Sequence, residues 1–159
     1  MRRISSPSAD EASAKTPSRP RLLYLIKRSY AAAKIVLDDM TRAHGLTTSD
    51  YTILSFLRRL EPCSAADLAR AQKVTPQAVT QQVVPLLAKG LVTRRESDEN
   101  RRIALLSMTP RGHVCLAEIS AQARQIETEM LAGLSAEDRE VVLDFLIRST
   151  AILENRGPS

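Results

Sequence analysis

Two short helices with clear start and end signals lie between Ser64 and Gly90, and they constrain the fold more than any other part of the chain. The first begins at Ser64, where Asp67 three residues later completes a pair of side chains that satisfy each other's free backbone N–H groups. After a three-residue turn, the second begins at Thr75 with Pro76 in its first position, where no N–H is needed, and it ends at Gly90. Two helices this short and this close predict a helix-turn-helix.

Two polar strands and a charged turn are expected directly after these helices. The strands are predicted at residues 91–96 and 101–107, and residues 97–100 form the tip between them. Two arginines stand on each side of the tip: Arg94, Arg95, Arg101 and Arg102. The whole stretch from residue 64 to residue 112 is therefore typical of a device that reads DNA.

Helical periodicity covers most of the remaining chain. Apolar residues recur at helical spacing over residues 21–45, and a second helix, capped by Asp50, covers residues 47–62. A helix over residues 110–133 is about 35 Å long at the standard rise, and a last helix begins at Ser135. A compact monomer cannot cover the apolar sides of the first helix and of the last two, so we expect a homodimer.

The expected fold class is mainly α with a small β-hairpin wing, a winged helix-turn-helix domain plus terminal helices that form a dimerisation region. Residues 1–19 are rich in Ser, Pro, Ala and basic side chains, with almost nothing to bury, and predict a disordered basic tail. Residues 20–154 are expected to form a single domain. Within it, 47–108 is the winged helix-turn-helix, and 20–45 and 109–154 are the dimerisation helices.

Composition fits a protein whose partner is a polyanion. The 159 residues carry a formal net charge of +5, although charge alone is a weak signal. Two cysteines far apart in sequence do not make a disulfide framework or a zinc site, and no apolar run reaches the length of a membrane span, so we expect a cytoplasmic protein without a membrane partner. The two histidines, His44 and His113, have neither a phosphate loop nor metal-ligand spacing nearby. We therefore expect no enzyme, no catalytic residue, no metal and no cofactor.

The order of these parts resembles the MarR family of winged helix-turn-helix transcription regulators. The resemblance covers about residues 21–153, and it is carried by GLTTSDYTIL, SAADLARAQKVTPQAVTQQVVPLLAKGLV and RRESDENRRIALLSMTPRG. The residues that fall at the family's spacings are Leu68-Ala69, Gly90-Leu91-Val92, Asn100-Arg101-Arg102, and Thr109 with Gly112.

The resemblance implies a transcriptional repressor. Such a protein binds a pseudo-palindromic operator in double-stranded DNA as a homodimer built from its terminal helices, and a small aromatic ligand releases it. Peroxide-sensing relatives use a cysteine on the first helix, and this chain has none before Cys63. The alternative from another class is a winged-helix module for protein contacts, without operator-specific DNA binding.

Helix geometry predicts which side of the second helix reads DNA. With 100° per residue and Val79 at the centre of the buried face, Gln77, Gln81 and Val84 point outward and Thr80 lies on the flank. Glutamine pairs with adenine and apolar groups contact the thymine methyl, so readout should favour A·T pairs. The alternative is that these glutamines are merely solvated. Pro85 is expected either to kink this helix after Gln81 or to end its regular part early.

The resemblance also assigns the remaining site residues. The predicted DNA-binding set is Ser64, Thr75, Gln77, Thr80, Gln81, Arg94, Arg95, Arg101 and Arg102, with Arg101 the best candidate for insertion into a minor groove. Many relatives have aspartate where Asn100 stands, so Asp98 is expected to hold a wing arginine here. The family's ligand pocket implies Tyr30, His44, Tyr51 and Arg111 as ligand-binding residues, each with an alternative as packing or surface.

Overall fold

The computed structural model describes residues 19–98 and 100–156, and the expected basic tail lies almost entirely outside them. These residues belong to two compact units that divide between Ile35 and Val36, inside the first helix. Each unit is described by itself below. No helix in the described ranges is long and apolar enough to cross a membrane.

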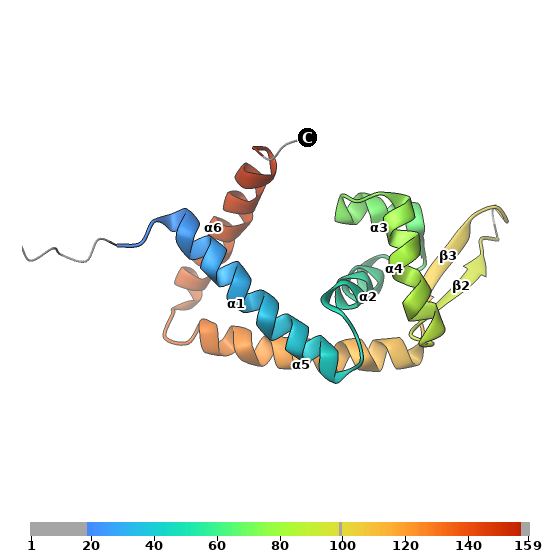
Figure 1. Ribbon diagram of the computed structural model, residues 1–159, viewed down its shortest axis with the longest axis horizontal. Coiled ribbons are helices and arrows are strands. Elements are labelled where there is room, and N and C mark those ends of the chain that lie inside the picture. The colour runs from blue at the N-terminus through green and yellow to red at the C-terminus, as the bar shows by residue number, and fades with distance from the viewer. Residues whose placement is uncertain (1–18, 99, 157–159) are drawn as a thin grey trace, which may run out of the picture. The chain divides into compact units, whose positions relative to one another are not determined.

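The fold is mainly helical with a small antiparallel sheet, as expected (Figure 1). The elements in chain order are α1 (Leu22–Ala43), α2 (Thr48–Leu60), β1 (Cys63–Ser64), α3 (Ala65–Gln72), α4 (Pro76–Ala88), β2 (Val92–Glu96), β3 (Ala104–Met108), α5 (Pro110–Met130) and α6 (Ala136–Glu154). The helix-turn-helix is α3 and α4, and the wing is β2 and β3.

The predicted hairpin is formed by β2 and β3, and the sheet gains a third strand that was not predicted, in the order β1-β3-β2. In β1, Cys63 pairs with Leu106 of β3; a two-residue strand has no periodicity that a sequence pattern could show. The second wing strand begins at Ala104, so the prediction that it begins at Arg101 was wrong. It is also not a polar strand, because Leu106 and Met108 are buried in the core.

The predicted helix starts are confirmed by their caps. Ser64 with Asp67 at the start of α3, and Thr47 with Asp50 at the start of α2, each form a complete reciprocal pair of side chain to backbone hydrogen bonds. The regular part of α4 continues past Pro85 to Ala88, so the proline does not end it. The expected end of α5 at Gly133 was wrong: α5 stops at Met130, and a short turn follows before α6.

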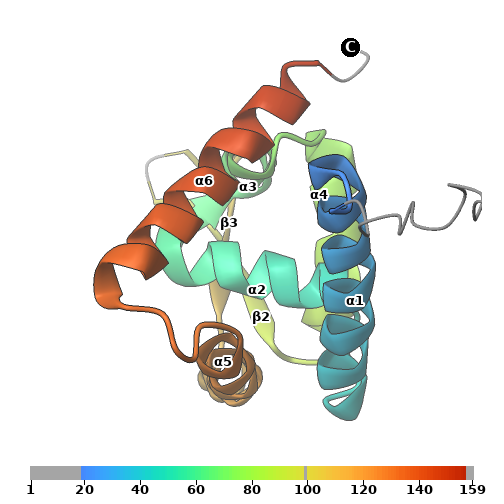
Figure 2. The ribbon, with the colours of Figure 1, turned by 90° about the vertical axis from the view of Figure 1, so that its left-hand side faces the viewer.

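The core of the second unit lies among α2, α3, α4, the sheet and the first half of α5. Figure 2 shows α5 nearly end-on beside α2. The largest side chains that are fully buried there are Ile53, Leu54, Leu57, Leu68, Val79, Leu86, Leu116 and Ile119. They come from four helices whose apolar faces converge, which fixes the orientation of α4 relative to the wing.

The junction between α4 and α5 is closely packed. The backbone N–H of Thr109 donates to Leu91 O at 3.0 Å, and the Thr109 hydroxyl donates to Gly90 O at 2.8 Å. A Cβ at Gly112 would lie 2.1 Å from Leu91 O, so only glycine fits there without a shift of the backbone. The first turn of α5 therefore rests directly on the segment that links α4 to β2.

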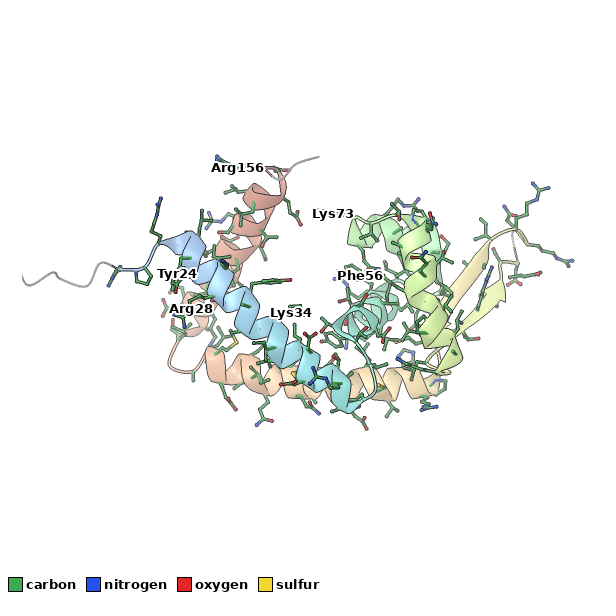
Figure 3. The ribbon with its side chains drawn as sticks, viewed as in Figure 1. Tyr24, Arg28, Lys34, Phe56, Lys73 and Arg156 are labelled. Atoms are coloured by element: carbon green, nitrogen blue, oxygen red, sulfur yellow. The ribbon has the colours of Figure 1, made fainter. Side chains whose placement is uncertain are left out.

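Two helical segments leave their apolar side chains uncovered. Leu22, Leu23 and Ile35 in the described part of the first unit are more than half exposed. In the same segment the Arg28 guanidinium lies 5.9 Å from the centroid of the Tyr24 ring, one turn away (Figure 3). The structure describes all of α6, and none of its residues is buried.

Candidate nucleic-acid interface and the cavity beside it

The outward face of α4 carries the residues that the helical angle predicted. Val79, Val83 and Leu86 are buried against the core, which confirms the predicted inner face. Gln77, Gln81 and Val84 are exposed, and Val84 leaves 57% of its surface accessible although it is apolar. The exposed row thus has two amide side chains followed by one apolar side chain, and it contains no arginine.

Hydroxyl groups in the predicted DNA-binding set are engaged within their own helices. The Ser64 hydroxyl donates to Asp67 Oδ2 at 2.6 Å, and the Thr75 hydroxyl accepts the backbone N–H of Ala78 at 3.2 Å. The Thr80 hydroxyl donates to Pro76 O at 2.9 Å. Each of these side chains therefore makes a hydrogen bond within its own helix end or turn.

The wing holds its arginines in different ways. Arg94 and Arg95 are exposed on β2, opposite Leu106 and Leu105 of β3. Arg95 Nη1 lies 3.1 Å from Asp98 Oδ2, which confirms that Asp98 holds a wing arginine.

Asn100 makes a side-chain hydrogen bond in the turn before β3. Its Oδ1 accepts the backbone N–H of Arg102 at 3.0 Å. Arg101 and Arg102 lie in the turn rather than on a strand, and both side chains are exposed. Two exposed arginines thus follow Asn100 directly in the turn.

A small hollow of about 120 Å³ separates the recognition helix from the wing. Thr80 of α4 and Arg94 of β2 both line it, and its other walls include Val83, Val84 and Leu106. Side chains of the helix and of the wing therefore border the same hollow.

Three of the four predicted ligand residues belong to the second unit, and those three do not line one cavity. Tyr30 belongs to the first unit and is 69% exposed, whereas Tyr51 on α2 is half-buried and packs against the core of the second unit. His44 and Arg111 line a different cavity of about 480 Å³, which we call the junction cavity. Its walls are His44, Gly45, Lys89, Leu91, Arg111, Val114, Cys115 and Glu118.

One electrostatic contact beside this cavity was missed by sequence reasoning. Lys89, the residue that caps the C-terminus of α4, places Nζ 3.2 Å from Asp50 Oδ2 at the start of α2. Asp50 had been identified only as a helix cap, and its side chain is 7% exposed, whereas the Lys89 side chain is 37% exposed and reaches it from the surface. The pair ties the end of the recognition helix to the start of α2.

A second missed contact involves Glu61 at the end of α2. Its Oε2 accepts the backbone N–H of Met108 at 2.6 Å, and its Oε1 lies 3.1 Å from His113 Nε2. This carboxylate joins α2, β3 and α5. Its partners are 47 and 52 residues away, and no local pattern signals them.

Neither cysteine has the environment of a reactive thiol. Burial raises the pKa of Cys63 to about 11, and the carboxylates of Asp67 and Glu61 add to the effect. Burial, followed by the charge of Glu118, also raises the pKa of Cys115. Across residues 19–98 and 100–156, His, Cys, Asp and Glu side chains do not gather in groups of three that could hold a metal ion.

Comparison with known proteins identifies the family. The model of the MarR family matches residues 44–103. The regulator YdgJ of Bacillus subtilis is 31% identical over 111 residues, 70% of this chain and 68% of its own. The repressor Rv2887 of Mycobacterium tuberculosis is 30% identical over 113 residues, 71% of this chain and 81% of its own.

A solved structure shares the fold. Staphylococcus aureus MarR, solved in complex with salicylate and kanamycin, superimposes with a TM-score of 0.73 at 14% identity, over 85% of this chain and 91% of that one. The identity between the sequences, the family model and the winged helix-turn-helix agree, and the chain belongs to the MarR family of transcriptional regulators.

Proposed function

We propose that this transcriptional regulator is a repressor that binds a pseudo-palindromic operator in double-stranded DNA as a homodimer, and that a small aromatic ligand releases it. The observation that carries the DNA-binding part is the exposed row of Gln77, Gln81 and Val84 on α4, which lies beside a wing with four exposed arginines. Exposed side chains on the helix are available for base edges in the major groove, and the arginines beside them are available for the phosphates.

The recognition face favours A·T pairs. Gln81 offers the two hydrogen bonds that match the N6 and N7 atoms of adenine, and Val84 offers methyl groups for contact with the thymine methyl. The strongest guanine contact comes from arginine, which this helix lacks. Specificity therefore rests on A·T contacts in the major groove, together with the width of the neighbouring minor groove.

The wing supplies cations to the sugar-phosphate backbone and to the minor groove. Arg101 at the tip is the candidate for groove insertion, because its exposed side chain lies in a turn where Asn100 makes a side-chain hydrogen bond. Arg95 forms an ion pair with Asp98, whose carboxylate is exposed to water, so this pair contributes little stability. A DNA phosphate can therefore replace the carboxylate, which makes Arg95 the candidate for a phosphate contact.

The homodimer follows from the apolar side chains of α6. Val142, Phe145 and Ile152 of this helix are 36%, 38% and 56% exposed in the single chain. A helix of 19 residues with no buried side chain needs a partner, and two-fold symmetry supplies the same helix from a second copy. Two reading heads related by such an axis must lie about 34 to 36 Å apart to enter successive major grooves.

Support for ligand release comes from the family and from chemistry. Staphylococcus aureus MarR has been solved with salicylate, an aromatic acid. The candidate residues for such a ligand in this chain are of two kinds. Tyr30 and Tyr51 offer aromatic rings, and His44 and Arg111 can pair with a carboxylate.

A binding titration tests the proposal. Fluorescence anisotropy would compare the DNA upstream of the protein's own gene with a scrambled duplex of the same composition, at several salt concentrations. Gln81→Ala should lower the preference for particular base pairs by about 1 to 3 kcal/mol. Arg95→Ala should weaken binding to both duplexes and reduce the slope of log affinity against log salt by about 0.9.

A glutamine outside the predicted interface provides the control. Gln125→Ala changes an exposed glutamine of α5 outside the predicted interface and should leave both affinities unchanged. Equal affinity for the two duplexes, unchanged by Gln81→Ala, would instead favour the winged-helix module for protein contacts.

A further inference from the structure

Lys73 lies in the turn between α3 and α4, two residues before Thr75, the cap of the recognition helix (Figure 3). Its backbone is left-handed, with a φ of 56°, and in the described ranges it is the only residue other than glycine with a positive φ. Glycine adopts this conformation at lower cost, because a Cβ crowds the backbone there. A lysine at such a position therefore points to a use for its side chain.

The ammonium group of Lys73 contacts the end of α6. Its Nζ lies 2.5 Å from Oε2 of Glu154, the last residue of that helix, and both residues belong to the second unit. Across residues 19–98 and 100–156 this is the only ion pair between α6 and the helix-turn-helix. A second ion pair on α6, between Arg148 and Asp144, stays within the helix. Glu154 therefore joins the proposed dimerisation helix to the start of the recognition helix.

The ion pair between Lys73 and Glu154 is open to water. Their side chains are 72% and 49% exposed. An exposed pair contributes little to stability, because water and salt screen its attraction and two long side chains must be held in one geometry. The ammonium group can therefore exchange this carboxylate for another anion at a small loss of free energy.

The surroundings of Lys73 in the chain favour a DNA phosphate as that anion. Residues 68–95 include no acidic side chain, so the positive end of the α4 dipole has no carboxylate of its own. Arg70, one turn earlier, is paired with Asp67 within α3. The exposed row of the recognition helix begins at Gln77, four residues after Lys73. DNA that lies along this row brings its phosphates to the start of α4.

We propose that Lys73 binds a DNA phosphate, and that Glu154 occupies its ammonium group when DNA is absent, so that α6 carries an internal competitor of DNA. A phosphate that approaches the ammonium also meets the charge of Glu154, so the two anions exclude each other. The ion pair stabilises the free protein and not the complex, and it therefore lowers the affinity for every DNA sequence alike. This inference rests on the proposed DNA binding and adds a contact outside the predicted interface.

Anisotropy titrations of the full-length protein with the upstream duplex and the scrambled duplex test the competition. Glu154→Gln should raise the affinity for both by about 1.4- to 5-fold for each reading head, the range that corresponds to one exposed ion pair. Lys73→Gln should weaken binding to both and reduce the salt slope, as the loss of one phosphate contact per head requires. The control is Asp144→Asn, which removes the same charge from α6 and should leave both affinities unchanged.

A double variant separates competition from a general effect of charge. In the Lys73→Gln background, Glu154→Gln should have no further effect, because the carboxylate has lost the ammonium group for which it competes. An equal gain in both backgrounds would mean that Glu154 acts by long-range repulsion, and it would refute the competition. An affinity that Glu154→Gln leaves unchanged or lowers would refute it as well, a loss because the ion pair would then hold the helix-turn-helix in the orientation that DNA requires.

A carbodiimide cross-link tests the ion pair without DNA. The reagent activates the Glu154 carboxylate, and the Lys73 amine then displaces the activating group as a urea and forms an amide bond, which peptide mass spectrometry locates. We expect this cross-link in the wild type and in Asp144→Asn, with a yield at least fivefold lower when DNA is saturating. No cross-link without DNA, or a yield that bound DNA leaves unchanged, overturns the inference. Failure of the wild type to bind DNA refutes the proposed function, and the DNA-free cross-link still decides whether Glu154 holds Lys73.

Discussion

Replacing Gly112 by alanine tests how closely α5 approaches the end of α4. An ideal Cβ at this position lies 2.1 Å from Leu91 O and 3.1 Å from Leu91 C, whereas real Cβ atoms essentially never come closer than 3.0 Å to another atom. The obstacle is backbone, so it cannot rotate away. The first turn of α5 and Leu91 must therefore separate, which strains the hydrogen bond from the Thr109 N–H to Leu91 O.

The magnitude is a balance of three contributions. Overpacking of a closely packed contact costs about 1 to 3 kcal/mol. Weakening of one buried hydrogen bond costs about 1 kcal/mol more. Alanine is more favourable than glycine in a helix by about 1 kcal/mol, which opposes both. The net expectation is a loss of about 1 to 3 kcal/mol in the free energy of unfolding, which lowers Tm by roughly 2 to 12 °C for a chain of this length.

Urea and thermal unfolding would measure this loss at one fixed protein concentration, since the stability of the proposed homodimer would depend on concentration. Ala117→Gly, at an exposed position of the same helix, is the control, and it should cost about 1 kcal/mol through helix propensity alone. A Gly112→Ala variant as stable as the wild type, or more stable, would refute the close approach, because propensity would then be the whole effect.

Three further substitutions probe other parts of the molecule. Phe145→Glu on α6 should shift the protein to monomers in light scattering and weaken operator binding at least tenfold, whereas Glu140→Lys on the same helix should do neither. Hydrogen bonds from the Ser64 hydroxyl and backbone lower the pKa of Asp67, so its stabilising effect is present at neutral pH and is lost as the pH falls through the lowered pKa. Asp67→Asn should therefore flatten the dependence of stability on pH on the acid side. Because burial raises the pKa of Cys63 from 9.0 to about 11, its stabilising effect is lost as the pH rises through that window, and Cys63→Ala should lose less stability than the wild type between pH 8 and pH 10.5 in urea titrations.

The features that the sequence predicted correctly depend on residues that are close together in the chain. The caps at Thr47, Ser64 and Thr75 involve residues at most three positions apart, so their hydrogen bonds depend only on the local chain conformation. The outward row on α4 follows from the helical angle in the same way, because burial of one face leaves the other exposed. The sequence identified Gly112 as a residue at a family spacing. It could not predict the close contact with Leu91, because nothing in the sequence says which backbone segment lies against this glycine.

The sequence by itself therefore determined the family, the helix-turn-helix, the outward face of its second helix and the arginine-rich wing, because each depends on residues that are near neighbours along the chain. The tertiary structure decided the rest. It paired β1 with β3 and tied Lys89 to Asp50 across 39 residues. It also placed His44 and Arg111 around one cavity, while Tyr51 packs against the core. These contacts join residues that are distant in the chain, and they exist only because the apolar faces of α2, α3, α4 and α5 pack into one core that brings their polar ends together.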